Sequence, residues 1–323
     1  MRMLSHQAKS ARADLPMLKD VTNPGAPAAH PRIGRMWVFW AAKYGILSLG
    51  AVIMILPFAD MLIGALRTPA ERLARPPVYW PAIPQWQNFI RAFTDLPMVA
   101  WLTNSVIVTG AITVVQLATS ALAGFALAKY RFRGRDLILR FVLVAQIFPF
   151  FLFIIPMFFI LRYWPFAGGN DWLGQGGTGL LDSYLALILP FAVSWYGVFL
   201  MRQFMMTVPD ELLDAARIDG ASEFGLFWRI ALPLVSPGMV TLGLLVWIYH
   251  WNEVIWTMTV TRAAPELQTV TVGIQLLRSE FFDERNQSLQ QAALAVSVIP
   301  VIVLFLCLQR FYVRGLSMGS LKG

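Results

Sequence analysis

The sequence predicts an all-α integral membrane protein with six transmembrane helices and a short two-helix segment before the fifth helix. Of the 323 residues, 57% are hydrophobic and only 14% are charged, whereas soluble domains carry about 25% charged residues. Six apolar runs are long enough to cross a bilayer, since a span needs roughly 20 such residues. We therefore expect lipid to cover much of the surface.

The six spans are expected at residues 37–66, 101–128, 137–161, 180–201, 234–260 and 291–312. In the second span, Ser120, Gly124 and Ala128 recur every four residues, and such a stripe of small residues lets another helix approach closely. Prolines inside the third and fourth spans are expected kinks, tolerated where neighbouring helices satisfy the freed carbonyls. The whole membrane domain is expected at 37–318.

The distribution of basic residues predicts the topology. The loop at 129–136 holds four basic residues and one acidic residue, which favours the cytoplasmic side. Six spans then place both termini and the segment at 207–233 on that side too. The first external loop is more basic than this topology favours, but the other loops agree. The net charge of +8 does not indicate nucleic-acid binding, because the basic residues lie beside apolar runs.

Four regions outside the spans were assigned from composition. Residues 1–36 are basic and lack the apolar run of a signal peptide, so we expect a disordered tail, and residues 319–323 form a second short tail. Residues 167–179 contain six glycines and are expected to form a flexible surface loop rather than a nucleotide site. The loop at 261–290 carries Phe281 and Phe282, and is expected to fold back or contact a partner.

The segment at 207–233 is too charged to cross a bilayer and has the pattern of two short helices. Pro209 suits a first helical position, and Asp219-Gly220 is a turn signal at which Gly220 can take a positive φ. Ser222 can cap a second helix, whose apolar face is predicted to hold Phe224, Phe227, Trp228 and Ala231. Exposed apolar residues on such a unit favour docking into a partner's groove.

The fifth span holds the one cluster of polar side chains inside an apolar run. Tyr249, Asn252, Glu253 and Trp256 are spaced to share one helical face, and His250 is close enough in sequence to pair with Glu253. Aromatic rings beside amide and carboxylate groups suit a sugar. An interfacial aromatic belt with Glu253 reaching water explains the same pattern, so both interpretations remain open.

Neither enzymatic chemistry nor a resident metal is predicted for this chain. No Gly-Lys pair occurs in the sequence, so there is no P-loop for ATP hydrolysis, and there is no H-E-x-x-H metal motif. The single cysteine, Cys307, excludes an internal disulfide. The three histidines, His6, His30 and His250, are too far apart in sequence to indicate a shared metal site.

The segment at 207–233 also carries a longer pattern with fixed spacing. Its members are Asp214-Ala215-Ala216, Asp219-Gly220-Ala221, Phe227, Ile230 and Leu232-Pro233. This pattern resembles the EAA signature of ABC-importer permease subunits, except that Asp214 stands where the signature has glutamate. The resemblance extends over all six spans. The chain is similar to the carbohydrate-uptake branch of these subunits, in particular to its shorter, maltose-permease-type second subunit.

This resemblance implies a bacterial inner-membrane permease for an oligosaccharide or related glycoside. The implied partners are a homologous second permease subunit, two ATPase subunits that bind ATP and Mg²⁺, and an extracytoplasmic solute-binding protein. The segment at 207–233, with Phe224 included, is implied to couple to the ATPase. The loop at 261–290 is implied to probe the binding protein, and residues 320–323 to reach the ATPases. The alternatives are another solute, such as glycerol phosphate, and an ion-coupled carrier that uses Glu253 and His250.

Overall fold

The computed structural model describes residues 33–76, 78–280 and 286–320, and their regular elements are all helices. The elements of the first half are α1 (Ile33–Leu66), α2 (Pro69–Leu73), α3 (Gln87–Thr94), α4 (Met98–Lys129), α5 (Arg135–Ala145), η1 (Phe150–Phe153) and α6 (Ile154–Arg162). Those of the second half are α7 (Tyr184–Ile188), η2 (Leu189–Phe191), α8 (Trp195–Met206), α9 (Asp210–Ile218), α10 (Glu223–Gly225), η3 (Leu226–Ala231), α11 (Leu232–Leu234), α12 (Ser236–Trp251), α13 (Ile255–Val260), η4 (Pro265–Leu267), α14 (Val270–Glu280) and α15 (Gln287–Ser320).

The chain divides into two units, residues 1–56 and 57–323. In the described part of the first unit, α1 is exposed along its length and strongly apolar. Its aromatic residues pack along one turn, where Trp40 stacks on Tyr44 at a ring-centroid distance of 5.9 Å and Lys43 lies over the Trp40 ring. A helix that exposes this much apolar surface is suited to lipid rather than to water.

Three helices are long and apolar enough to cross a membrane: α1, α4 and α15. Three further candidates are bent pairs, so the described residues hold up to six spans if each pair counts as one. The pair α5 with η1–α6 is bent by 99°, the pair α7–η2 with α8 by 48°, and the pair α10–α11 with α12 by 78°. The expected spans at 137–161, 180–201 and 234–260 are therefore not continuous helices.

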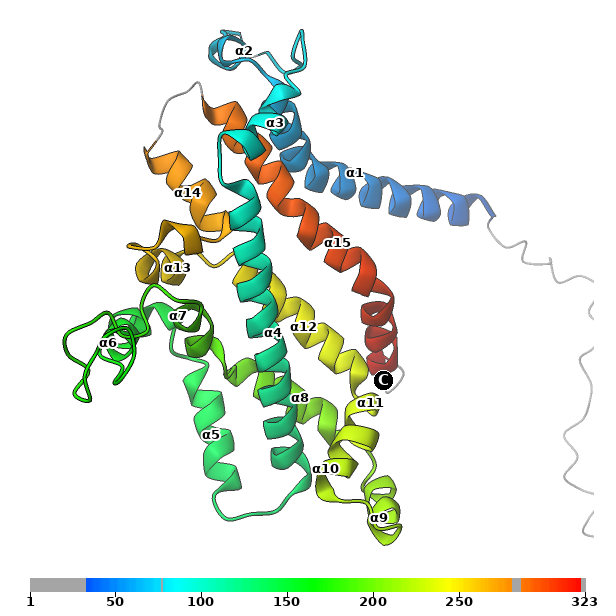
Figure 1. Cartoon of the computed structure of the whole chain (residues 1–323). Coiled ribbons are helices and arrows are strands. Elements are labelled where there is room, and N and C mark those ends of the chain that lie inside the picture. The colour runs from blue at the N-terminus through cyan, green and yellow to red at the C-terminus, as the bar shows by residue number, and fades with distance from the viewer. Residues whose placement is uncertain (1–32, 77, 281–285, 321–323) are drawn as a thin grey trace, which may run out of the picture. The chain divides into compact units, whose positions relative to one another are not determined.

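In the second unit, α4 lies between α8 and α12, and α12 packs against α15 (Figure 1). The stripe of small residues is confirmed at the first of these contacts. Ser120 is fully buried, and a Cβ added at Gly124 would lie 2.7 Å from the Arg202 backbone nitrogen on α8. Since that atom belongs to a helix backbone, only glycine allows this close approach.

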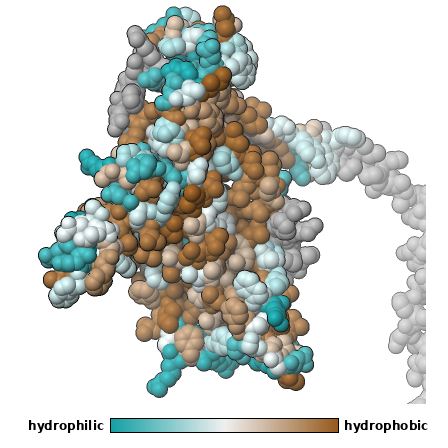
Figure 2. Space-filling model, in the orientation of Figure 1, coloured by the Kyte–Doolittle hydropathy of each residue, from teal (hydrophilic) through white to brown (hydrophobic). Residues whose placement is uncertain are grey.

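Apolar residues cover the middle of the second unit, while hydrophilic residues gather toward its ends (Figure 2). One end holds α9, α10 and the loop between α4 and α5, and the other holds α2, α3 and the start of α4 (Figure 1). The expected loop at 167–179 is held together by Asn170, whose buried side chain donates to the carbonyls of Arg162 and Trp164. Its amide oxygen accepts from the Gly177 N–H at 2.9 Å. The loop therefore has a defined fold.

Some of the sequence predictions lie outside the described residues. These are most of the N-terminal tail, with His6 and His30, the residues Phe281 and Phe282, and the last three residues of the chain. The helix α15 continues through Ser320, two residues beyond position 318, where the membrane domain was expected to end.

Candidate functional site

The segment at 207–233 begins with a contact to the end of α4. Pro209 is the N-cap of α9, one position earlier than expected. The Lys129 ammonium donates to the Asp210 carboxylate at 2.6 Å and to the Val208 carbonyl at 2.5 Å. This ammonium group is the main cause that lowers the pKa of Asp210. The first turn of α9 is thereby fixed to α4.

α9 ends in a Schellman motif, as the Asp219-Gly220 pair predicts. Gly220 has φ +84°, its N–H donates to the Arg217 carbonyl at 3.0 Å, and the Ala221 N–H donates to the Ala216 carbonyl at 2.9 Å. These two bonds satisfy carbonyls that the end of a helix otherwise leaves unpaired. Ser222 then caps the next helix, because its hydroxyl accepts a backbone N–H at 3.2 Å.

A charged network crosses this turn and joins both short helices. The Arg217 guanidinium donates to the Asp214 carboxylate at 2.7 Å and makes two bonds, of 3.0 and 3.2 Å, to Glu223. The Tyr130 hydroxyl donates to Glu223 from the end of α4. The bonds from Arg217, followed by the one from Tyr130, lower the pKa of Glu223. The aspartate that replaces the signature glutamate therefore reaches a partner within α9 itself.

The predicted apolar face of the second helix is divided between two surroundings. Phe227 and Ala231 are buried, and the Phe227 ring lies 5.4 Å from that of Phe125 on α4. Phe224 and Trp228 are 67% and 59% exposed and stack on each other at 6.3 Å. Because η3 is a π-helix with a wider turn, the expected 3.6-residue face does not form as one surface.

The remaining signature residues divide into an exposed group and a half-buried group. Asp214, Ala215, Asp219 and Pro233 are exposed, while Ala216, Ala221, Ile230 and Leu232 are half-buried against the core. At the end of α9, Ile218 is 86% exposed. We call Phe224, Trp228 and Ile218 the docking edge. Three exposed apolar side chains on a polar end of the molecule are typical of an interaction surface.

The second candidate region, at 249–256, does not form the predicted helical face. Asn252 is the C-cap of α12, and Glu253 precedes α13 and caps it. The Glu253 carboxylate accepts the backbone N–H groups of Trp256 at 2.6 Å and Thr257 at 2.9 Å. Trp256 is fully buried and donates its indole N–H to the Ala186 carbonyl. The helix breaks because capping groups at 252 and 253 replace the continuing backbone bonds.

The expected pairing of His250 with Glu253 is absent, because both residues have other partners. The His250 ring is buried against Phe191 at a centroid distance of 4.6 Å, and its Nε2 lies 3.1 Å from Gln116 Nε2. The ring of Tyr249, which is 58% exposed, packs edge-to-face on the His250 ring at a centroid distance of 5.0 Å, and the exposed Asn252 donates its amide to the Ile248 carbonyl. The proposed role of these residues in a substrate pathway stays a prediction, now without a shared face.

Two polar side chains of α4 bind the backbone at the break before α8, and this contact was not predicted from the sequence. Gln116 donates its amide to the Phe191 carbonyl at 2.7 Å, and the Thr119 hydroxyl donates to the Ala192 carbonyl at 2.9 Å. Those carbonyls lack helical partners because the chain bends there. A glutamine inside an apolar span and Pro190 in the neighbouring span were the available signals. Only the fold shows that they meet.

A groove of about 1080 Å³ lies between α6, α13 and α14. Its walls are mainly apolar, with Ile155, Phe159, Ile255 and Met258 among them, and its polar contributors include Arg262, Gln268 and Gln275. The groove borders the break at residues 252–254 through Val254. The groove therefore lies beside residues that were predicted to contact substrate.

The sequence of this chain matches one protein family over a range of residues that includes most of the features above. Residues 120–318 match the family described as "Binding-protein-dependent transport system inner membrane component". The chain belongs to this family. The matched residues include the whole segment at 207–233. From here we call it the coupling segment, after the role proposed for it below.

Curated relatives of this inner-membrane component cover nearly its whole length. The arabinooligosaccharides transport system permease protein AraQ of Halalkalibacterium halodurans is 31% identical over 88% of this chain and 96% of its own. The sulfoquinovosyl glycerol permease protein SmoH of Agrobacterium fabrum is 32% identical over 83% and 89%. The sn-glycerol-3-phosphate permease protein UgpE of Yersinia pestis is 31% identical over 84% and 93%.

Solved structures show that the same fold occurs in bacterial importers. A chain of an ABC transporter that imports the acidic polysaccharide alginate superposes with a TM-score of 0.70 at 21% identity, over 89% of this chain and 100% of the other. A chain from the alginate transporter in complex with a periplasmic protein bound to an alginate pentasaccharide gives 0.61 at 14% identity, over 87% and 96%. At these identities the likeness concerns the fold.

Proposed function

We propose that this inner-membrane component forms half of the translocation pathway of an ABC importer and receives its driving force through the coupling segment. The other half is a homologous second permease subunit. Two ATPase subunits bind ATP and Mg²⁺, and an extracytoplasmic protein delivers the solute. The observation that carries the proposal is the docking edge, an exposed apolar surface held on a turn that is fixed by charge and by backbone bonds.

The coupling segment is built to pass a displacement into the bundle. Lys129 ties its first helix to α4, and Phe227 packs against Phe125 of the same helix. Its other end runs through η3 and α11 directly into α12. A partner that moves the docking edge therefore acts on two spans together, because interlocked side chains and short helical connections transmit displacement with little compliance.

The proposed topology places the coupling segment in the cytoplasm, where ATPases bind nucleotide. Its partner Lys129 begins the strongly basic loop at 129–136, and short basic loops favour the cytoplasmic side. Both termini are proposed to lie on that side as well. The opposite end, which carries α2, α3 and α14, then faces the solute-binding protein.

We propose an oligosaccharide or related glycoside as the solute, in line with the name of the relative AraQ. Glycerol phosphate is the second candidate, because UgpE is a relative of similar identity and Arg262 supplies one positive charge to the groove beside α13. The ion-coupled alternative loses its basis. Both carboxylate oxygens of Glu253 accept backbone N–H groups of α13, and His250 contacts Gln116 rather than Glu253.

The coupling role is tested by making the docking edge polar. In cells that express the chain with the neighbouring transporter genes, the double variant Phe224→Ser/Trp228→Ser is expected to lose ATPase co-purification. Burying two aromatic side chains is worth about 1.5–3 kcal/mol each, so retention should fall by roughly a hundredfold or more. The matched control is Phe166→Ser/Trp172→Ser, which removes two exposed aromatics from the glycine-rich loop.

Comparable thermal midpoints of the two double variants in detergent would show that folding is intact. If the docking-edge variant retains the ATPase as well as the control does, the proposed coupling role is wrong.

A further inference from the structure

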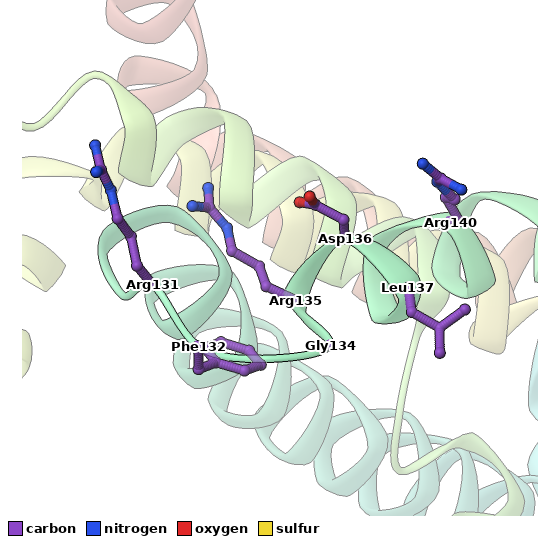
Figure 3. A pocket seen from close by; sticks show the side chains of 7 residues that line it. All are labelled: Arg131, Phe132, Gly134, Arg135, Asp136, Leu137 and Arg140. Atoms are coloured by element: carbon purple, nitrogen blue, oxygen red, sulfur yellow. The ribbon is translucent and has the colours of Figure 1, made fainter.

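A basic cavity lies where α4 ends and α5 begins, and the proposed transport cycle does not use it. Its volume is about 470 Å³. The lining includes Arg131, Arg135 and Arg140 together with Asp136, and its apolar contributors are Phe132 and Leu137. Three arginines and one carboxylate therefore line the same open cavity. In Figure 3 the three arginine side chains point to one side of the loop, and Leu137 points to the other.

The arginines of this cavity have few partners inside the chain. Within residues 33–76, 78–280 and 286–320, Arg131 and Arg140 make no hydrogen bond or ion pair, although Arg131 acts on Asp210 through space. Arg135 donates only its Nε, to the Leu127 carbonyl at 2.9 Å. Its terminal nitrogens remain available. Since all three cations line one cavity, an anion bound there would be stabilised by their charge.

The cavity lies at the level where apolar spans end. α4 is long and apolar enough to span a membrane up to Lys129, and α5 begins a bent pair that together is long and apolar enough. Beside the arginines, Leu137 is 72% and Phe141 is 60% exposed. Arg140 stands about 7.5 Å farther along α5 than Arg135 at a rise of 1.5 Å per residue. Its long side chain can reach back to the charged level.

We propose that this cavity binds the headgroup of an anionic phospholipid with a hydroxylated headgroup, such as phosphatidylglycerol. The guanidinium groups of the lining arginines hold the phosphate, since their paired N–H groups match phosphate oxygens. Asp136 accepts a headgroup hydroxyl, and the acyl chains lie along Leu137 and Phe141. The exposed apolar side chains next to the cations favour a lipid over free phosphate.

Lipid titration of the full-length chain in detergent, read by native mass spectrometry, tests this proposal. The probes are dioleoyl phosphatidylglycerol, dioleoyl phosphatidylcholine and inorganic phosphate. The variant is Arg131→Gln/Arg140→Gln, which spares the bond from Arg135 to α4. The matched control is Arg133→Gln/Arg229→Gln, which removes two exposed charges outside the cavity.

Phosphatidylglycerol is expected to bind more tightly than phosphatidylcholine, and the cavity variant is expected to weaken it by about tenfold or more. The control should stay within about twofold, since its exposed charges do not line the cavity and are screened by salt. Equal weakening by the control, equal binding of both lipids, or displacement by millimolar phosphate would overturn the assignment. Should the glutamine variant fail to fold, Arg131→Lys/Arg140→Lys keeps the charge and is still expected to weaken binding by losing the planar fork.

This site depends only on a membrane around the spans. It can therefore hold if ATPase docking fails its own test, and the two results are independent.

Discussion

The coupling segment and the break between α12 and α13 are both polar interruptions of an apolar chain, but different contacts hold them. In the coupling segment, Arg217 bonds to residues three and six positions away. At the break, Trp256 bonds to a carbonyl 70 positions away, and His250 contacts a side chain 134 positions away. Local contacts shape the turn of the coupling segment, and bonds from Lys129 and Tyr130 fix it to α4. The break, in contrast, takes the partners of Trp256 and His250 from distant helices.

The largest expected effect is that of replacing Trp256, which should destabilise the helix bundle as a whole and not only a binding face. Replacing this fully buried side chain with alanine is expected to cost about 3–5 kcal/mol, because it leaves a cavity and an unpaired Ala186 carbonyl. The thermal midpoint in detergent should fall strongly. Tyr249→Ala, from the same predicted face but 58% exposed, should change stability by no more than about 0.5 kcal/mol.

Similar losses of stability in the two alanine variants would contradict the division of this face into buried and exposed members.

A smaller effect is expected at Gly220, where the coupling segment should fail locally while the bundle survives. Its φ is +84°, and a Cβ there would meet no atom within 4 Å, so strain and not collision sets the cost. Gly220→Val is expected to cost about 1–2 kcal/mol or more at this turn and to reduce ATPase retention about tenfold. Gly220→Asn should retain most of it, since asparagine tolerates this conformation.

Membrane insertion should be the same for both substitutions. If the valine variant retained the ATPase fully, the turn would not be what positions the docking edge.

The smallest expected effect is at Glu253, where capping and substrate contact predict different outcomes. Glu253→Gln keeps one acceptor oxygen of the two that α13 uses, and should cost about 1 kcal/mol of stability. Uptake should fall only in proportion to the folded fraction. The matched control, Glu266→Gln, changes an exposed carboxylate in η4 and should leave stability unchanged.

If uptake of the Glu253 variant collapsed while its thermal midpoint stayed the same, the carboxylate would contact the solute and the capping interpretation would be incomplete.

The positions of the apolar runs followed from the sequence, but their continuity did not. The stripe of small residues correctly indicated close packing on α4. The break before α8 is stabilised by Gln116 and Thr119, which donate to it from α4. The break before α13 is stabilised by the capping side chain of Glu253. Periodicity cannot reveal these breaks, since the apolar pattern runs through them unchanged.

By itself, the sequence determined the membrane class, the family signature and the two-helix form of the coupling segment with its turn at Gly220. These follow from composition and from contacts within a few residues. Only the tertiary structure decided that Phe227 is buried while Phe224 and Trp228 remain on the docking edge. It also decided that Tyr249 and Trp256 lie in different surroundings. The physical reason is that burial depends on which distant helix packs against a residue, and the local sequence pattern does not specify that helix.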